Sequence, residues 1–233
     1  MKVEIWSDVM CPFCYIGKRR FETALQQLSF KDDIEVEWKS FQLDPSILYQ
    51  PGKNINQYLA EHKGISVQRA KEMNDYVTNM AAAEGLQYNF DKAVVANSFD
   101  AHRFSHLASK YGKGDAAEEA LFKAYFTEGK NIADHETLVQ LGTDIGLNGA
   151  EVKEVLENKA YANEVHNDIA EAGTLGVRGV PFFVLDRKYA VSGAQAAEAF
   201  HQALEQAYNE WKKENNNLTI IGGETCTPDG DCK

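Results

Sequence analysis

Cysteine is scarce in this sequence of 233 residues, which contains four. Proteins built on a disulfide scaffold use cysteine far more densely, so that class is excluded. Positive charge is also under-represented, because 24 Lys and Arg stand against 35 Asp and Glu and give a formal net charge of −11. Without a basic stripe to neutralise phosphates, neither nucleic acid nor an anionic membrane surface is expected as a partner.

Long apolar runs are missing as well. No stretch of the sequence approaches the ~20 residues needed to cross a bilayer, so an integral membrane protein is excluded. The first residues, MKVEIWSDV, carry two acidic side chains where a signal peptide needs an apolar segment. If Met1 is the natural start, we therefore expect a cytoplasmic protein. The 44% of hydrophobic and 25% of charged residues are typical of a soluble globular chain with a sizeable core.

The pattern of apolar residues predicts an α/β protein whose middle is helical. Residues 3–6 and 34–43 predict two strands, with a helix between them that begins at about Pro12. Residues 54–173 show helical spacing almost throughout and predict six or seven helices. Residues 182–185 and 189–191 predict a strand hairpin, and a last helix follows.

Cys11 and Cys14 form a C-x-x-C motif where the first strand meets the helix. Unpaired backbone N–H groups and the positive end of the helix dipole favour a thiolate at Cys11, and the thiolate is the nucleophilic form of cysteine. Residues three apart on a helix are neighbours, so the two cysteines can close a disulfide. Cys14 lies on the apolar stripe of the helix and should be buried, whereas Cys11 should be exposed. This pattern predicts a redox couple.

Two other interpretations of the motif stay open. The same spacing provides half of a zinc site, whose second half would have to come from the distant pair Cys226 and Cys232. The cysteines could also be buried structural residues. Because the motif stands between a strand and a helix, we favour redox chemistry, and we expect no metal or other cofactor besides the cysteine pair.

Four segments resemble a known family: WSDVMCPFCYIGKRRFE, NSFDAHRFSHLA, DHETLVQLGTDIGL and GVRGVPFFVLDRKYAVSGAQ. In this order they resemble the DsbA-like thioredoxin superfamily, most closely its cytoplasmic FrnE-like branch, over about residues 1–212. The resemblance implies a thioredoxin fold with an all-helical domain inserted between the second and third strands. We therefore expect a thioredoxin-like domain from residues 1–48 and 174–214, an inserted helical domain from 49–173, and a C-terminal tail from 215–233.

The resemblance also implies an activity, namely disulfide exchange with protein substrates. Cys11 would attack the substrate disulfide, and Cys14 would resolve the mixed disulfide that forms. Both would lie beside a cis peptide bond between Val180 and Pro181. X-Pro bonds tolerate this isomer, although the sequence alone does not select it. The backbone at this bond would pair with an extended substrate segment. Partners would be protein or peptide thiols and disulfides, with a small thiol or a reductase for recycling, and a homodimer is a further candidate.

Two features of this sequence differ from the family pattern. The dipeptide Pro12-Phe13 replaces the Pro-His of periplasmic DsbA, so a cationic ring that would stabilise the thiolate is lacking and we expect a less oxidising couple. In the tail, Cys226 and Cys232 flank a turn-forming Pro-Asp-Gly and are a candidate auxiliary redox pair. They would relay electrons or form a stabilising clip, and an incidental local disulfide is an equal alternative.

Other functions compete with disulfide exchange. The family branch is also similar to kappa-class glutathione transferases and 2-hydroxychromene-2-carboxylate isomerases, which act on small molecules and have Ser where Cys11 stands. A zinc-dependent redox switch would use both cysteine pairs. Asn97, His102 and Arg103 are candidates for a substrate groove, although a solvated helix face is the favoured interpretation of that segment.

Overall fold

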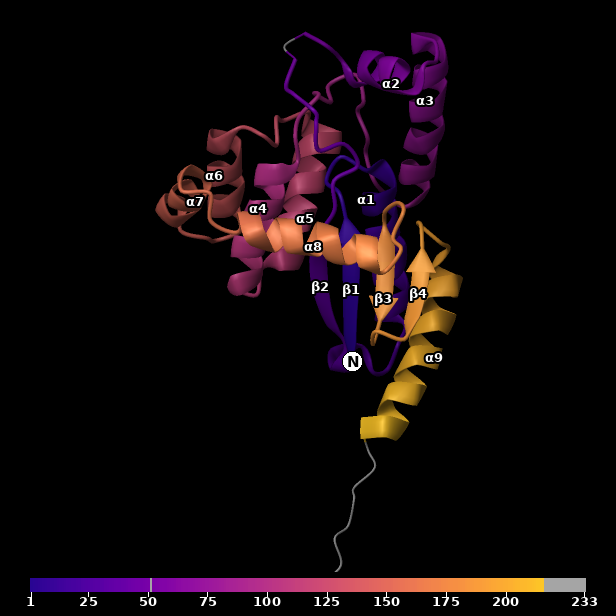
Figure 1. Cartoon of the computed structure of the whole chain (residues 1–233). Helices are drawn as coiled ribbons and strands as arrows, with labels where there is room; N and C mark the ends of the chain where they lie inside the picture. The colour runs from indigo at the N-terminus through magenta and orange to yellow at the C-terminus, as the bar shows by residue number, and fades with distance from the viewer. Residues whose placement is uncertain (51, 216–233) are drawn as a thin grey trace, which may run out of the picture.

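The structure is a computed structural model that describes residues 1–50 and 52–215. Its elements confirm the predicted order of an α/β beginning, a helical middle and an α/β end (Figure 1). The strands are β1 (Lys2–Ser7), β2 (Glu35–Ser40), β3 (Phe182–Leu185) and β4 (Tyr189–Ser192). The α-helices are α1 (Pro12–Gln26), α2 (Ile55–Lys63), α3 (Val67–Ala83), α4 (Phe99–Lys110), α5 (Gly114–Phe122), α6 (His135–Asp144), α7 (Gly149–Glu157), α8 (Ala162–Thr174) and α9 (Ala197–Asn215).

The strands form one sheet with the order β2-β1-β3-β4. β1 runs parallel to β2 and antiparallel to β3, and β3 and β4 form the predicted hairpin. β1 is therefore a central strand, with Ile5 opposite both Trp38 and Phe183. Strands that are covered on both faces are apolar on both, and Ile5 and Trp6, which point to opposite faces, are both fully buried.

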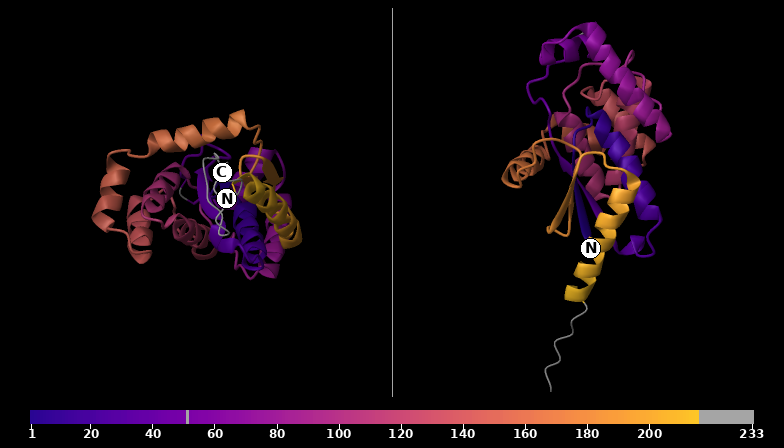
Figure 2. Two further views of the ribbon diagram at one scale, coloured as in Figure 1. Left: turned by 90° about the horizontal axis from the view of Figure 1, so that it is seen from below. Right: turned by 90° about the vertical axis from the view of Figure 1, so that its right-hand side faces the viewer.

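Helices cover both faces of this sheet (Figure 2). α1 and α9 lie on one face, where Phe21 and Phe200 pack against Phe183. α8 crosses the other face, and there the ring N–H of Trp6 donates to the carbonyl oxygen of Asp168 at 2.9 Å. The carboxyl end of β1, which leads to the C-x-x-C motif, is fixed between these two layers.

The helices α2 to α8 stand between β2 and β3 in the sequence and build most of a second apolar core. Several begin where the sequence places a capping side chain: Asn54, Ser66 and Asp134 each accept a hydrogen bond from the backbone N–H three residues on. The second core extends to Cys11 and Cys14. The fold is thus the expected thioredoxin fold with an all-helical insertion between its second and third strands, and no helix in the described part of the chain is long and apolar enough to span a membrane.

Candidate active site

The C-x-x-C motif lies at the junction of β1 and α1, as the sequence predicts. Cys11 is the N-cap residue of α1, and Pro12 occupies the first turn, where its missing N–H costs no hydrogen bond. The turn before the helix is closed by the backbone N–H of Cys11, which donates to the carbonyl oxygen of Asp8 at 2.9 Å. Both cysteines are thiols in this structure. The strand, the turn and the helix therefore hold the pair at a helix N-terminus, where negative charge is favoured.

Cys14 is buried as predicted, but the prediction of an exposed Cys11 is wrong. Cys11 is only 4% exposed. Its thiol donates a hydrogen bond to the carbonyl oxygen of Val180 at 3.4 Å, and the hydroxyl of Tyr88 donates to the carbonyl oxygen of Pro12 at 2.7 Å. Segments remote in sequence thus lie against the motif and bury Cys11, whereas the side chain of Phe13 is 37% exposed.

The loop of Val180 and Pro181 reaches the motif from the other end of the chain. The peptide bond between these residues is cis. Gly17 allows the close approach, because a Cβ atom at Gly17 would lie 2.9 Å from Cγ of Pro181. Cys11, Cys14, Val180 and Pro181 are therefore brought together at one end of β1.

The environment of Cys14 favours the protonated thiol. Burial raises the pKa of Cys14 well above its ordinary value, and contact with Cys11 raises it further. Ser7 and the backbone of Asp8, which lie close to the sulfur, act in the opposite direction and lower the pKa of Cys14. At neutral pH Cys14 thus holds a proton that it must lose before it can act as a nucleophile.

A cavity of about 430 Å³ opens beside Cys11, between the motif and the helices α2 and α3. This volume lies within the range of about 300 to 1,000 Å³ that is common for ligand sites. Its apolar walls include Met10, Leu43, Ile55, Val77 and Phe90. Its polar groups include Asp8, Asp44, Tyr58, His62 and Tyr125. The site therefore presents a largely apolar pocket next to the candidate nucleophile.

The three groove candidates of the helical insertion lie elsewhere. His102 and Arg103 are each 2% exposed, so the solvated helix face that the sequence favours is wrong, and neither residue lines the cavity. Arg103 donates to the carbonyl oxygens of Leu156 and Ala160 and thereby caps the end of α7. Asn97 precedes α4 and donates from Nδ2 to carbonyl oxygens of the loop that carries cavity residues. These residues support the site from outside.

Behind the motif lies a buried set of titratable groups that the sequence did not reveal. Nε2 of His102 lies 3.7 Å from Oδ1 of Asp8. Burial alone would lower the pKa of His102, but Asp8 outweighs it and the pKa is raised. Burial raises the pKa of Glu118, whose Oε1 accepts from the hydroxyl of Ser105 at 2.7 Å. The turn before Cys11 is thus tied electrostatically to α4 and α5.

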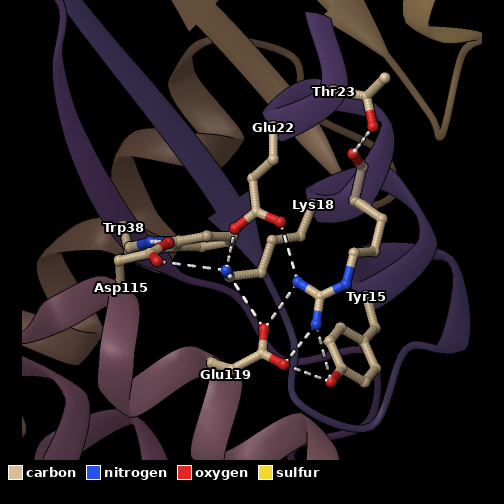
Figure 3. A network of polar contacts seen from close by, with 8 residues as sticks. Tyr15, Lys18, Glu22, Thr23, Trp38, Asp115 and Glu119 are labelled. Atoms are coloured by element: carbon tan, nitrogen blue, oxygen red, sulfur yellow. Dashed lines mark hydrogen bonds and ion pairs between the residues drawn. The ribbon is translucent and has the colours of Figure 1, made fainter. Parts of the chain in front are cut away.

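A second polar network joins α1 to α5 (Figure 3). Its centre is Lys18, which is 2% exposed and lies between Glu22, Asp115 and Glu119, with 3.2 Å from Nζ to the carboxylates of Asp115 and Glu119. The hydroxyl of Tyr15 also donates to Glu119, at 2.5 Å. Lys18 stands four residues after Cys14, on the same helical face, and this spacing was the one signal that it is buried. The network fixes α1 against the inserted helices.

No group of three or more His, Cys, Asp or Glu side chains that could hold a metal ion occurs within residues 1–50 and 52–215. The candidate auxiliary pair, Cys226 and Cys232, lies outside the described residues.

A buried C-x-x-C pair at a helix N-terminus, beside a cis-proline loop, defines a thioredoxin-fold protein. The chain belongs to the DSBA-like thioredoxin domain family, which it matches over residues 2–205. It is similar to the uncharacterized protein YwbO of Bacillus subtilis, with 29% identity over 87% of this chain and 94% of that protein. It is also similar to the crystal structure of a probable DsbA oxidoreductase, SCO1869 from Streptomyces coelicolor, with 43% identity and a TM-score of 0.86 over 100% of this chain and 98% of that one.

More distant solved structures share the fold. The cytosolic disulfide reductase DsbM of Pseudomonas aeruginosa is 16% identical, with a TM-score of 0.62 over 92% of this chain and 98% of that one. A 2-hydroxychromene-2-carboxylate isomerase is 17% identical, with a TM-score of 0.63 over 94% of this chain and 100% of that one. These two proteins have different activities, although their sequence identities to this chain are similar. Their likeness to this chain therefore concerns the fold alone.

Proposed function

We propose that this protein is a thiol–disulfide oxidoreductase that exchanges disulfides with protein or peptide substrates through Cys11 and Cys14. The observation that carries the proposal is the placement of Cys11, at the N-terminus of α1 and 3.4 Å from the carbonyl oxygen of Val180, with Cys14 buried one turn further along the helix. The alternative enzymes of the resemblance have Ser at the position of Cys11, and the two cysteines retained here favour redox chemistry.

In the reducing direction, the thiolate of Cys11 attacks one sulfur of a substrate disulfide. A bond forms between Cys11 and that sulfur, the substrate bond breaks, and the second substrate sulfur leaves as a thiolate that takes up a proton. Cys14 then loses its proton and attacks Sγ of Cys11, which releases the first substrate sulfur as a thiolate. The substrate gains two electrons, and Cys11 and Cys14 become a disulfide; the reverse sequence oxidises a dithiol.

The surroundings of Cys14 suit the second step. Ser7 and the backbone of Asp8 lower the pKa of Cys14 and so favour the negative charge that must form on its sulfur, although burial opposes it. For the first step, the backbone of the Val180 loop can pair with an extended substrate once Cys11 is deprotonated and no longer donates to the Val180 carbonyl oxygen. A small thiol or a reductase would return the oxidised pair to the dithiol.

Insulin reduction and reactivation of scrambled ribonuclease test this proposal. We expect the wild type to accelerate at least one of the two reactions and Cys11→Ser to accelerate neither. If the wild type fails in both assays, the proposal is wrong, and the small-molecule class represented by the 2-hydroxychromene-2-carboxylate isomerases becomes the better candidate.

A further inference from the structure

The cavity beside Cys11 contains a buried hydroxyl group without a partner. Tyr125 is 1% exposed and lines the cavity. Its hydroxyl oxygen makes no hydrogen bond to any residue of the described chain. Unpaired buried polar groups are rare in folded proteins, because each one forfeits its hydrogen bonds to water. The hydroxyl of Tyr125 therefore contributes no hydrogen bond to the fold.

The backbone that carries Tyr125 is unusual. Residues Lys123–Glu128 continue α5 as a π-helical segment. Such segments are rare and occur frequently at functional sites, since the wider turn changes the direction in which side chains point. A regular α-helix would direct this residue differently. The π-helical turn is a second observation, independent of the unpaired hydroxyl, that points to the cavity.

The electrostatic surroundings fix which kind of hydrogen bond Tyr125 can make. Burial raises the pKa of Tyr125, and the charges of Asp8 and Tyr58, which also line the cavity, raise it further. The phenol therefore keeps its proton and can donate it. An acceptor atom on a molecule in the cavity would satisfy this donor.

Asp8 supplies the complementary acceptor. It is 1% exposed, and its two oxygens accept from the backbone N–H groups of Met10, at 3.2 Å, and Leu43, at 2.7 Å. A carboxylate offers about four acceptor positions, so Asp8 can accept a further hydrogen bond from a ligand. Two carboxylates, Asp8 and Asp44, line the cavity against one lysine, Lys63, and this balance of charge disfavours an anionic ligand group.

We propose that this cavity binds an amide group next to the reacting disulfide, with Tyr125 donating to the amide oxygen and Asp8 accepting from the amide N–H. The apolar walls, which include Ile55, Val77 and Phe90, would hold a neighbouring apolar side chain. The inference rests on the proposed function and specifies its substrate class. That class is peptide disulfides with an apolar residue beside the cysteine, in preference to small anionic thiols.

Mixed disulfides of thionitrobenzoate test the inference, because attack by reduced enzyme releases the coloured anion. The probes are N-acetyl-leucyl-cysteine amide, the same compound with a free carboxylate, and 2-mercaptoethanol, which has neither an amide nor an apolar side chain. We expect wild type to have the highest kcat/KM for the amide. In Tyr125→Phe, the ratio of kcat/KM for the amide to that for the mercaptoethanol disulfide should fall about tenfold, mainly through KM, which corresponds to about 1.4 kcal/mol.

Two controls separate ligand binding from a structural role. Tyr76→Phe changes a tyrosine of α3 that is 65% exposed and should leave the ratio as in wild type. The melting temperature of Tyr125→Phe should equal or exceed that of wild type, since the hydroxyl has no partner to lose. An unchanged ratio in Tyr125→Phe, or equal turnover of the amide and the free carboxylate by wild type, would overturn the inference alone. No release by wild type from any probe would contradict the proposed function itself.

Discussion

The thiol of Cys11 donates to the carbonyl oxygen of Val180 across 169 residues of sequence. Only the protonated thiol can donate this bond, because a thiolate has no hydrogen to give. Deprotonation of Cys11 thus releases a backbone acceptor in the Val180 loop at the moment when the sulfur becomes nucleophilic. Under the proposed function, that carbonyl is then free to accept from the backbone of an extended substrate.

Replacing the resolving cysteine should arrest the reaction halfway. In Cys14→Ser, Cys11 can still attack a substrate disulfide, but no second thiol is present to release it. We expect a mixed disulfide between Cys11 and the substrate to accumulate, seen by mass spectrometry without reductant. The double variant with Cys11→Ser is the control and should form none. A Cys14→Ser protein that turns over peptide disulfides as fast as wild type would exclude this assignment of roles.

The buried thiol of Cys14 should make the reduced protein sensitive to alkaline pH. Its pKa is raised in the folded state, whereas in the unfolded chain it returns to its ordinary value near 9.0. Below that pH both states hold the proton and stability is unaffected. Above it the unfolded state binds fewer protons than the folded state, so the free energy of unfolding falls, by at most about 1.4 kcal/mol per pH unit.

Urea unfolding with excess reductant measures this effect. The difference in unfolding free energy between wild type and Cys14→Ala should be constant from about pH 6 to pH 8 and shrink towards pH 10. The buried tyrosines titrate in both proteins, so their contribution cancels. A difference that stays constant over the whole range would argue against a raised pKa of Cys14.

Lys18 should contribute to stability more than an ordinary surface lysine. In Lys18→Met, the carboxylates of Glu22, Asp115 and Glu119 lose a buried cation, but each is about a third or more exposed and stays partly hydrated. We therefore expect a loss of about 1–2 kcal/mol in urea unfolding, below the ~3–5 kcal/mol typical when a buried charge is left unpaired. Lys71→Met removes an exposed pair with Asp75 and should lower the free energy of unfolding much less than Lys18→Met does. Equal losses in the two variants would refute the role of burial.

The reduction potential should respond to the residue between the cysteines. Phe13 is partly exposed, so a histidine fits at this position without disturbing the core. A protonated imidazole beside Cys11 stabilises the thiolate and hence the reduced form, which makes the couple more oxidising. We expect Phe13→His to raise the potential by about 30 mV, equivalent to about 1.4 kcal/mol, in glutathione buffers. Phe13→Leu should leave it unchanged, and the effect of histidine should fade as pH rises above its pKa.

The role of Cys226 and Cys232 can be tested by measuring how fast the Cys11-Cys14 pair is recycled between turnovers. If Cys226 and Cys232 relay electrons to the Cys11 pair, the double variant Cys226→Ser, Cys232→Ser should slow steady turnover severalfold. A single turnover of pre-reduced enzyme should proceed at the wild-type rate, because it needs no recycling. Stopped-flow and steady-state assays on the same substrate compare the two. Equal steady-state rates would end the relay hypothesis.

Local patterns predicted the elements of the fold well. Alternation predicted β1 and β2, the helical stripe predicted the burial of Cys14, and turn residues predicted the β3–β4 hairpin. These features depend on the spacing of neighbouring residues, which the sequence displays directly. The position of the helical insertion followed from the family resemblance and agrees with the observed order of elements.

Tertiary contacts account for what the sequence did not predict. Cys11 was expected to be exposed, but its thiol donates to Val180, 169 residues away, and Tyr88 donates to the neighbouring Pro12 from 76 residues away. His102 and Arg103 have polar side chains typical of a surface, yet a carboxylate and helix-end carbonyls partner them inside the fold. Tyr125 lies on a π-helical turn that shifts the helical register, so periodicity carried no signal for it.

The long sequence separation between Cys11 and Val180 has a consequence during synthesis. A ribosome that adds about 5–20 residues per second completes the Val180 loop roughly 10–30 s after Cys11. During this interval β1 lacks β3 as its neighbour, and the thiols lack the cover that the finished protein gives them. The nascent chain therefore leaves the sulfur of Cys11 open to oxidation before the fold can shield it.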